Sequence, residues 1–317
     1  MNDHSLTELD EKIIGLIEQN GRISNRDLAK TLGVSERQAG SRLRRLIDND
    51  LVKMITVVDA YAVGFQIALT IGVEVSGRPP RDVAQDLAKI PNIVAVALLS
   101  GPYPIEAIVV LEDLPALHAF IAGPMAQIKG IAGLHPSLFL DVMKYETGSG
   151  PVFDHQSELA IPASSNLDEI DTAIINCLWR NSSETNESIA GALGLSEATV
   201  RKRMSLLRER NVIHITAMRN IAIGKQVIFA IVGIDVDPAQ MDAAAAALTA
   251  LRQVHLLASV LGRANLIAQV LVEDSVALTA LLNDKIARAP GVRRTTCAQA
   301  SAVIKFDYRW RFSPHPR

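Results

Sequence analysis

The stretch Ile189–Leu207, IAGALGLSEATVRKRMSLL, predicts two short helices joined by a tight turn. Gly194 ends the first helix, since glycine readily takes the left-handed backbone found at a helix C-terminus. Ser196 is placed to cap the second helix, where apolar residues recur at i, i+4 and i+7 from Val200. The cations of this helix lie off that apolar stripe. This pattern favours a helix-turn-helix, although an ordinary surface hairpin with a solvated basic face fits a single copy equally well.

The same layout occurs a second time, 161 positions earlier, where Gly33 corresponds to Gly194. A chance surface hairpin is not expected to recur in register, so the repeat favours the helix-turn-helix. Repetition on this scale is a tandem duplication of whole domains rather than a solenoid. The offset holds without a gap for Asp10 and Asp171, Ala29 and Ala190, Ser35 and Ser196, Arg42 and Arg203, and Leu46 and Leu207.

Composition indicates a globular protein. The chain has 317 residues, of which 49 % are hydrophobic and 21 % charged, and this length is ample for several cores. Its net charge of −2 excludes a uniformly basic coat, but a nucleic-acid site needs only a local basic face. The two cysteines, Cys177 and Cys297, lack metal-ligand spacing, and we find no catalytic-triad, paired-carboxylate or phosphate-loop motif. We therefore expect no metal, no cofactor and no enzymatic activity.

Targeting signals are also missing from the sequence. The N-terminus is polar, and no apolar run is long enough to cross a bilayer. These observations predict a cytoplasmic protein with no membrane partner.

Each half of the chain reads as a three-helix unit with a β-branched wing, followed by the order β-α-β-β-α-β. The predicted fold class is α+β: a tandem repeat of a winged helix-turn-helix and a ferredoxin-like domain of the dimeric α+β barrel type. The two sheets are expected to pack face to face as an intrachain pseudo-dimer. The predicted domains are winged helix-turn-helix 1 (1–60), ferredoxin-like domain 1 (61–146), a Gly-, Pro- and Ser-containing linker (147–166), winged helix-turn-helix 2 (167–220) and ferredoxin-like domain 2 (221–317).

Four motifs in this layout resemble one family. They are LDEKII at Leu9–Ile14, IDTAII at Ile170–Ile175, LSEATV at Leu195–Val200 followed by Arg203, and DAYAVG at Asp59–Gly64. Together they resemble the Lrp/AsnC, or feast/famine, regulators over nearly the whole chain, twice. The resemblance implies a transcription regulator that binds double-stranded DNA. It implies sheet domains that dimerise and bind a small effector, often an amino acid, near subunit interfaces. One chain would then supply what a homodimer normally does.

The outward face of each second helix predicts the contacts to DNA. At 100° per residue, Arg37, Ser41 and Arg44 point away from the core of the first copy. Arg and Gln suit the edges of guanine and adenine, so the first helix is expected to read bases more strictly than the second. One or two of the cations are expected merely to solvate their helix. The predicted DNA-binding residues are Ser35, Arg37, Gln38, Ser41, Arg42, Arg44, Arg45, Ser196, Thr199, Arg201, Lys202 and Arg203.

The loop between the second and third strands of each sheet is the predicted effector site. Family members commonly have a Gly followed closely by an Asp there, whereas this chain has Pro104 and Asn265 in place of the carboxylates. A tight β-hairpin is the alternative for both loops. Arg263 suits a two-point hydrogen bond to a carboxylate, and a solvated loop cation is the alternative for it. The predicted effector-binding residues are Ser100, Gly101, Tyr103, Gly262, Arg263 and Asn265.

Two other functions stay open. The same architecture resembles siroheme decarboxylases, which hold a tetrapyrrole, but the nearest hint of their basic cluster is Met218-Arg219-Asn220. A scaffold without DNA binding is the third class, and the outward cations argue against it. At the far end, Phe306, Tyr308, Trp310 and Phe312 alternate with charged residues. This tail predicts either an extended last strand or an arm on another subunit, and hence a homo-oligomer.

Overall fold

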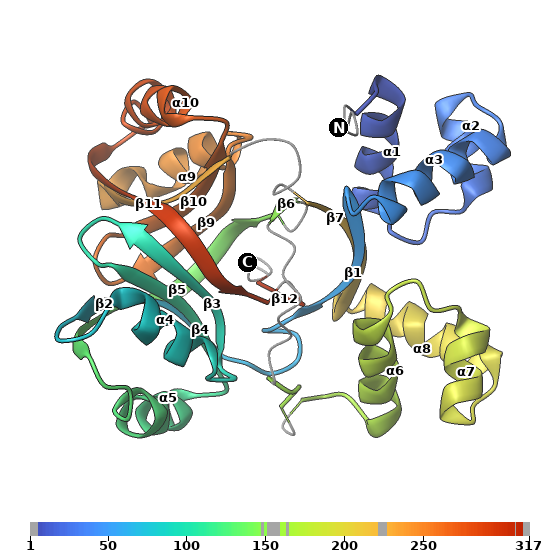
Figure 1. Cartoon of the computed structure of the whole chain (residues 1–317), viewed down its shortest axis with the longest axis horizontal. Coiled ribbons are helices and arrows are strands. Elements are labelled where there is room, and N and C mark those ends of the chain that lie inside the picture. The colour runs from blue at the N-terminus through green and yellow to red at the C-terminus, as the bar shows by residue number, and fades with distance from the viewer. Residues whose placement is uncertain are drawn as a thin grey trace.

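The computed structural model describes residues 6–146, 149–150, 159–162, 165–220, 227–307 and 309–312. In Figure 1 two three-helix units lie on one side of the molecule and a β-barrel lies on the other, with strands β1 and β7 between them. The mixed helix and strand content and the duplicated order of elements confirm the predicted fold class.

Two helical units with the same internal layout are separated in the sequence by the whole first sheet domain. Helical unit 1 consists of α1 (Glu8–Gln19), α2 (Asn25–Leu32) and α3 (Glu36–Asp48), and helical unit 2 of α6 (Glu169–Arg180), α7 (Asn186–Leu193) and α8 (Glu197–Glu209). The turn before each third helix depends on a glycine, since Gly33 and Gly194 have φ of 67° and 66°. A side chain is strained in this left-handed region, so glycine is the residue expected at both helix ends.

The predicted wings form a shared ribbon. Strand β1 (Val52–Asp59) pairs antiparallel with β7 (Ile213–Asn220), with Val52 opposite Arg219 and Val58 opposite Ile213. Each helical unit packs on the wing of the other half, because α1 lies against β7 and α6 lies against β1. The two units are therefore held together by exchanged wings within one chain.

The two sheet domains form one closed barrel of eight strands, with the order β10-β8-β11-β3-β4-β2-β5-β9. Its strands are β2 (Ile67–Val75), β3 (Ile93–Ser100), β4 (Ile105–Leu111), β5 (Ile131–Tyr145), β8 (Ile228–Val236), β9 (Val254–Leu261), β10 (Leu266–Val272) and β11 (Val292–Phe306). The accompanying helices are α4 (Pro80–Ala88), α5 (Leu114–Phe120), α9 (Met241–Thr249) and α10 (Ser275–Ala280), with short segments of 3₁₀-helix at Pro238–Gln240 and of π-helix at Ile121–Met125 and Leu281–Ile286.

The two halves of the barrel are joined edge to edge by hydrogen-bonded strands. The sequence predicted face-to-face packing of the sheets and did not predict these edge junctions. Strand β11 pairs antiparallel with β3, with Gln299 opposite Ser100. Strand β5 pairs antiparallel with β9, with Leu138 opposite Leu261. These two junctions are equivalent under the 161-residue offset. Closing the barrel removes both free edges of each sheet. The edge strands of an open sheet would instead be exposed to pairing with other chains.

Helical unit 2 shares its apolar core with the barrel, whereas helical unit 1 has a core of its own. One continuous cluster of buried residues contains Ile174 and Leu178 of α6 together with Val142 and Ile267 of the barrel. The core of unit 1 is a separate cluster that takes only Ala217 from the second half. The duplication has therefore produced two units that are attached in different ways.

The aromatic tail docks within its own chain, where the sequence had left an extended last strand and an arm on another subunit as alternatives. Strand β12 (Trp310–Arg311) pairs in parallel with β1, with Trp310 opposite Val58. Trp310 packs edge-on against Phe65 and Trp179, at 5.4 and 5.3 Å between ring centroids. Burial of this apolar surface accounts for the position of the tail. Tyr308 lies outside the described residues.

The segment 147–166, predicted as a linker, has structured parts. Strand β6 (Ser149–Gly150) pairs in parallel with β7, as β12 does with β1. Leu159 is buried in the cluster shared by the barrel and helical unit 2. Residues 147–148, 151–158 and 163–164 lie outside the described part of the chain.

Candidate nucleic-acid interface and barrel pocket

Helix α3 is fixed at its start by a serine cap. Ser35 Oγ accepts a hydrogen bond of 3.2 Å from the backbone N–H of Gln38, which satisfies one of the free donors of the first turn. Ser196 does the same in α8 by accepting from Thr199, at 3.1 Å. Both serines were predicted to contact DNA, and in the structure their hydroxyl oxygens are already engaged as caps.

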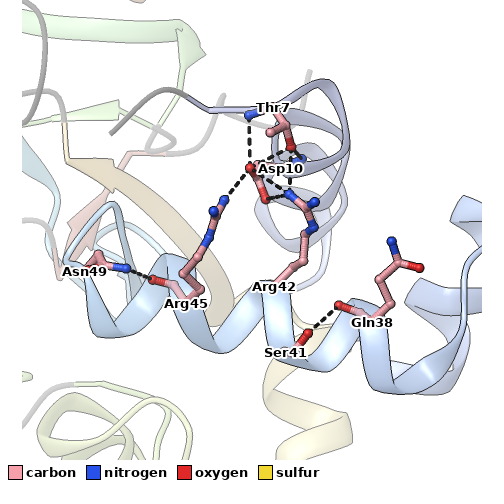
Figure 2. A network of polar contacts seen from close by, with 7 residues as sticks. All are labelled: Thr7, Asp10, Gln38, Ser41, Arg42, Arg45 and Asn49. Atoms are coloured by element: carbon pink, nitrogen blue, oxygen red, sulfur yellow. Dashed lines mark hydrogen bonds and ion pairs between the residues drawn. The ribbon is translucent and has the colours of Figure 1, made fainter. Parts of the chain in front are cut away.

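A buried carboxylate holds α3 against α1 (Figure 2). The Asp10 side chain is inaccessible to solvent and accepts hydrogen bonds from the backbone N and Oγ1 of Thr7, at 3.0 and 2.7 Å. Arg42 Nη1 and Arg45 Nη2 reach Asp10 from α3, at 3.2 and 2.5 Å. Burial by itself raises the pKa of Asp10, but the hydrogen bonds from Thr7 and Arg42 and the charge of Arg45 outweigh it and lower that pKa. Asp10 is therefore ionised and fixes the rotation of α3.

This clamp divides the cations of α3 into two groups. Arg42 and Arg45 are turned towards α1, although both were predicted to contact DNA. Arg37 and Arg44 are exposed, and within the described part of the chain neither forms a hydrogen bond or ion pair. The Gln38 side chain points away from Asp10 (Figure 2), and Ser41 Oγ donates to the Gln38 carbonyl at 3.1 Å. The free guanidinium groups of α3 thus lie on its outward side.

Helical unit 2 repeats this arrangement in a reduced form. Arg203, the equivalent of Arg42, contacts Asp168 and Asp171 at 2.7 and 3.3 Å. Arg201 is held by Glu197 one turn earlier, at 2.5 Å. Lys202 is exposed and is the remaining predicted cation of α8 that forms no ion pair among the described residues. Helix α8 therefore offers fewer free donors than α3.

A pocket of about 150 Å³ lies inside the barrel between the two halves. Its polar wall consists of Glu106 from β4 and Arg263 from the β9–β10 loop. Arg263 donates to both carboxylate oxygens of Glu106, and Thr70 Oγ1 donates to the same carboxylate. The other wall is largely apolar. The pocket is lined by Leu99, Pro102, Tyr103, Glu106, Ile231, Gly233, Arg263, Ala264, Ile267, Thr296, Cys297 and Ala298.

Two of the six predicted effector residues, Tyr103 and Arg263, line this pocket. The Arg263 guanidinium lies 5.0 Å from the centre of the Tyr103 ring, and the ring stacks on His135. The predicted partner of Arg263 was a ligand carboxylate, and in the structure the carboxylate of Glu106 occupies that role. The guanidinium is thus anchored to the protein by two hydrogen bonds.

The other predicted effector residues have structural roles. Asn265 exchanges two hydrogen bonds with the backbone of Val236, at 2.7 and 2.8 Å. Ser100 Oγ donates to the carbonyl of Gln299 at 3.1 Å. At Gly101 and Gly262 a Cβ atom would lie within 2.7 Å of Ala298 and 2.5 Å of Ser137, respectively, so both glycines permit a close approach of the two halves.

Sequence reasoning missed Glu106, Thr70 and Ser137. Ser137 Oγ accepts from the backbone N and the Nε of Arg263, both at 3.3 Å. The visible signal was a single carboxylate in the apolar run Ile105–Leu111, since buried charges in proteins are normally paired. Its partner was not foreseeable, because Arg263 lies 157 positions away in a loop.

Neither a metal site nor a membrane span is found in the described part of the chain. No group of three or more His, Cys, Asp or Glu side chains there is placed to hold a metal ion. Among the same residues, no helix is sufficiently long and apolar to span a membrane.

Curated relatives match a little less than half of the chain. The HTH-type transcriptional regulator FL11 of Pyrococcus furiosus is 30 % identical over 148 residues, which are 46 % of this chain and 97 % of that protein. An uncharacterised HTH-type transcriptional regulator of Pyrococcus abyssi is 28 % identical over 141 residues, which are 44 % of this chain and 89 % of that protein. Relatives of this kind thus correspond to one copy of the duplicated unit.

Among solved structures, those of the siroheme decarboxylase NirDL extend over both copies. The crystal structure of the siroheme decarboxylase NirDL has a TM-score of 0.67 at 14 % identity and covers 97 % of this chain and 94 % of its own. At this identity the likeness shows the shared tandem fold alone.

Two family models match the chain, each of them twice. The AsnC-type helix-turn-helix domain matches residues 6–47 and 167–208, over α1–α3 and α6–α8. The Lrp/AsnC ligand binding domain matches residues 68–149 and 229–310, over the two halves of the barrel. Because these matches extend over most of both copies, the chain belongs to the Lrp/AsnC family and carries both of its domains in duplicate.

Proposed function

We propose that this protein is a sequence-specific DNA-binding transcriptional regulator. The observation that carries the proposal is the division of cations on the third helix of each helical unit. Arg42 and Arg203 are used to hold the helix in place, whereas Arg37, Arg44 and Lys202 are exposed and form no ion pair among the described residues. A fixed helix with free outward donors is what recognition in the major groove requires.

Binding to DNA is the direct test. The purified protein is titrated against the duplex upstream of its own gene and against random duplex of equal length, at several salt concentrations. We expect preference for the upstream duplex and a steep loss of affinity with salt, because Lys and Arg displace counterions from phosphates. Equal affinity for both duplexes at every salt concentration would overturn the proposal.

We propose that an amino acid or a similar small acid binds in the barrel pocket. The pocket residues Ile231 and Ile267 belong to, or pack against, the apolar cluster that contains the core of helical unit 2. A ligand that repacks these side chains is therefore in contact with the DNA-binding half of the molecule. The apolar wall favours an aliphatic side chain, and Thr296 offers a hydroxyl to its polar end.

A thermal-shift screen of amino acids and related acids tests this proposal. We expect an aliphatic ligand to raise the melting temperature of the wild type, since binding to the folded state stabilises it. Ala264→Leu should abolish the shift by filling the pocket, while Ala119→Leu, an exposed position on α5, should retain it. A shift that survives Ala264→Leu would place the ligand elsewhere.

We propose that whole chains associate further. Among the described residues, Leu140 and Leu261 are large apolar side chains exposed on the neighbouring strands β5 and β9, which supports a contact between chains. Light scattering tests this, because a mass of 34.2 kDa at all concentrations would exclude association.

A tetrapyrrole enzyme is the second candidate, favoured by the likeness to the siroheme decarboxylase fold over nearly the whole chain. Against it, the barrel pocket of about 150 Å³ is small beside sites for drug-sized ligands, which are roughly 300–1,000 Å³. Its Arg263 is also neutralised by Glu106 and leaves no excess positive charge for a polycarboxylate. Titration with an iron uroporphyrin decides: saturable binding with a shifted absorption band would favour the enzyme, and an unchanged spectrum the regulator.

A further inference from the structure

Arg22 connects the two helical units directly. It lies in the loop between α1 and α2, and its guanidinium crosses to helical unit 2. Nη1 donates to Asn186 Oδ1 at 3.0 Å, and Nη2 donates to the backbone carbonyl of Glu184 at 2.6 Å. Both acceptors lie at the start of α7, which precedes the outward helix α8. One side chain of unit 1 is therefore bonded to the turn between α6 and α7 of unit 2.

The backbone beneath Arg22 is also fixed. The N–H of Gly21 donates to the carbonyl of Ile215 on β7, at 2.9 Å. A Cβ atom at Gly21 would lie 2.8 Å from the Ile215 carbonyl, so any larger residue at this position would push the loop away from β7. Arg22 is therefore held at its base by β7 and at its tip by α7.

Helical unit 1 is attached to the β1–β7 ribbon by Val52 and Ala217, which belong to its core, and by several polar contacts. Arg219 on β7 pairs with Glu11 and Glu18 of α1, at 2.7 and 3.0 Å. Thr216 Oγ1 donates to the Glu18 carbonyl at 2.7 Å. Unit 2, in contrast, shares an apolar core with the barrel. Unit 1 is thus the unit whose core is separate from the barrel, and Arg22 bonds it directly to unit 2.

The tie has no counterpart at the equivalent position of unit 2. Under the 161-residue offset the equivalent of Arg22 is Ser183, whose short side chain has no reach across to the other unit. The cleft of about 430 Å³ beside Arg22 is lined by three glutamates, Glu184, Glu187 and Glu197, of which Glu197 is paired with Arg201. The negative charges of Glu184 and Glu187 disfavour a phosphate in the cleft. Its surroundings therefore fit Arg22 as a link between the units better than as a contact to DNA.

We propose that Arg22 is a positioning residue that fixes the separation of the two outward helices, and hence the spacing between the two half-sites that one chain reads. In helix-turn-helix dimers this spacing follows from the geometry of the protein. Loss of the tie lets unit 1 take several positions on β7, so that several spacings are bound. The inference rests on the proposed DNA-binding function, but its structural part is measurable without DNA.

The first experiment measures the distance between the units. Spin labels are placed at Thr31→Cys on α2 and at its equivalent Ala192→Cys on α7, both exposed, in a Cys297→Ser background. We expect a narrow distance distribution for the full chain, a broad one for Arg22→Ala and an intermediate one for Arg22→Lys, which retains a donor. Arg81→Ala, an exposed arginine on α4, is the control and should keep the narrow distribution. An equally narrow distribution in Arg22→Ala would overturn the proposal.

The second experiment measures spacing on DNA. The half-sites selected by the wild type are joined by spacers of every length over one helical turn, and bound duplexes are sequenced. Arg22→Ala should bind at least three spacers within threefold of the best, where the wild type binds one, with unchanged half-site sequences and salt dependence. Gly21→Ala, which displaces the loop without changing charge, should also alter the preferred spacing.

A contact to phosphate predicts the opposite result. Arg22→Ala would then weaken binding to all spacers uniformly and reduce the salt slope by about one, which would overturn the positioning role. Absence of specific binding by the wild type would instead refute the proposed function, and the spin-label distances would still decide whether Arg22 ties the units together.

Discussion

Arg263 of the second half and Glu106 of the first half form a two-point ion pair across the barrel. The Glu106 side chain is only 3 % exposed. Under the 161-residue offset their equivalents are Pro102 and Ile267, so the pair occurs on one side of the pseudo-dimer only. The duplication has thus allowed the two halves to differ at their shared interface, which identical subunits are unable to do.

Removing one member of this pair should be costly. Arg263→Ala leaves the Glu106 carboxylate buried without its cation, and we expect a loss of about 3–5 kcal/mol in the free energy of unfolding. The double variant Arg263→Met/Glu106→Leu should recover much of that loss. Arg294→Ala, which breaks the exposed pair with Asp235, should cost about 0–1 kcal/mol. Urea unfolding measures all three, and a small loss in Arg263→Ala would show that Glu106 is solvated or protonated.

The Asp10 clamp should stabilise the folded protein. Asp10→Asn weakens the charge-assisted hydrogen bonds to Arg42 and Arg45, and we expect a loss of about 1–3 kcal/mol. Because the pKa of Asp10 is lowered in the folded state, its contribution is present at neutral pH. The contribution disappears as the pH falls through that lowered value. The difference between wild type and variant in thermal unfolding should therefore shrink in acid, and a constant difference would contradict the clamp.

Glu18 should show the opposite pH dependence. Burial and the charges of Glu11 and Glu146 raise the pKa of Glu18, whereas its pairing with Arg219 lowers that pKa. The raising effects are the larger, so the pKa of Glu18 is raised overall. A raised pKa means that the protonated form stabilises the folded state, and this stabilisation is lost as the pH rises through the raised value. Glu18→Gln should therefore gain stability relative to the wild type between acid and neutral pH. Melting temperatures across that range measure it, and a gap that narrows with pH would refute the expectation.

The two outward helices should read DNA unequally. A good bidentate contact from an arginine to a base discriminates by about 1–3 kcal/mol, so Arg44→Ala should relax base preference in one half-site. Lys202→Ala should weaken binding uniformly, as expected for a phosphate contact. Randomised-site selection on the wild type and both variants tests this. Two equally sharp, inverted half-sites for the wild type would contradict the asymmetry.

The C-terminal tail should hold helical unit 2 to the barrel. Trp310 is buried between Phe65 and Trp179, and Trp310→Ala should cost about 3–5 kcal/mol. The substitution should accelerate amide exchange more in α6 than in α1, because α1 belongs to a separate core. Leu114→Ala, at an exposed position on α5, is the control. Equal acceleration in α1 and α6 would show that the tail stabilises the molecule as a whole.

The local elements and the family could be predicted from the amino-acid sequence. Gly33 and Gly194 end their helices, and Ser35 and Ser196 cap the next ones, because backbone conformation and capping depend on residues a few positions apart. The repeat at 161 positions predicted the duplication, and the apolar spacing predicted which face of each helix is buried. The outward orientation of Arg37 and Arg44 followed from the same helical periodicity.

The pairing of polar groups, in contrast, became known only from the packing of the elements. Asp10 captures Arg42 and Arg45, Glu106 captures Arg263, and Arg22 reaches Asn186, and each partner lies far away in the chain. Periodicity gives the direction of a side chain on its own element, but it contains no information about what the packing of other elements places opposite. For the same reason, the sequence left an extended last strand and an arm on another subunit as alternatives for the tail, and Trp310 docks on β1 of its own chain.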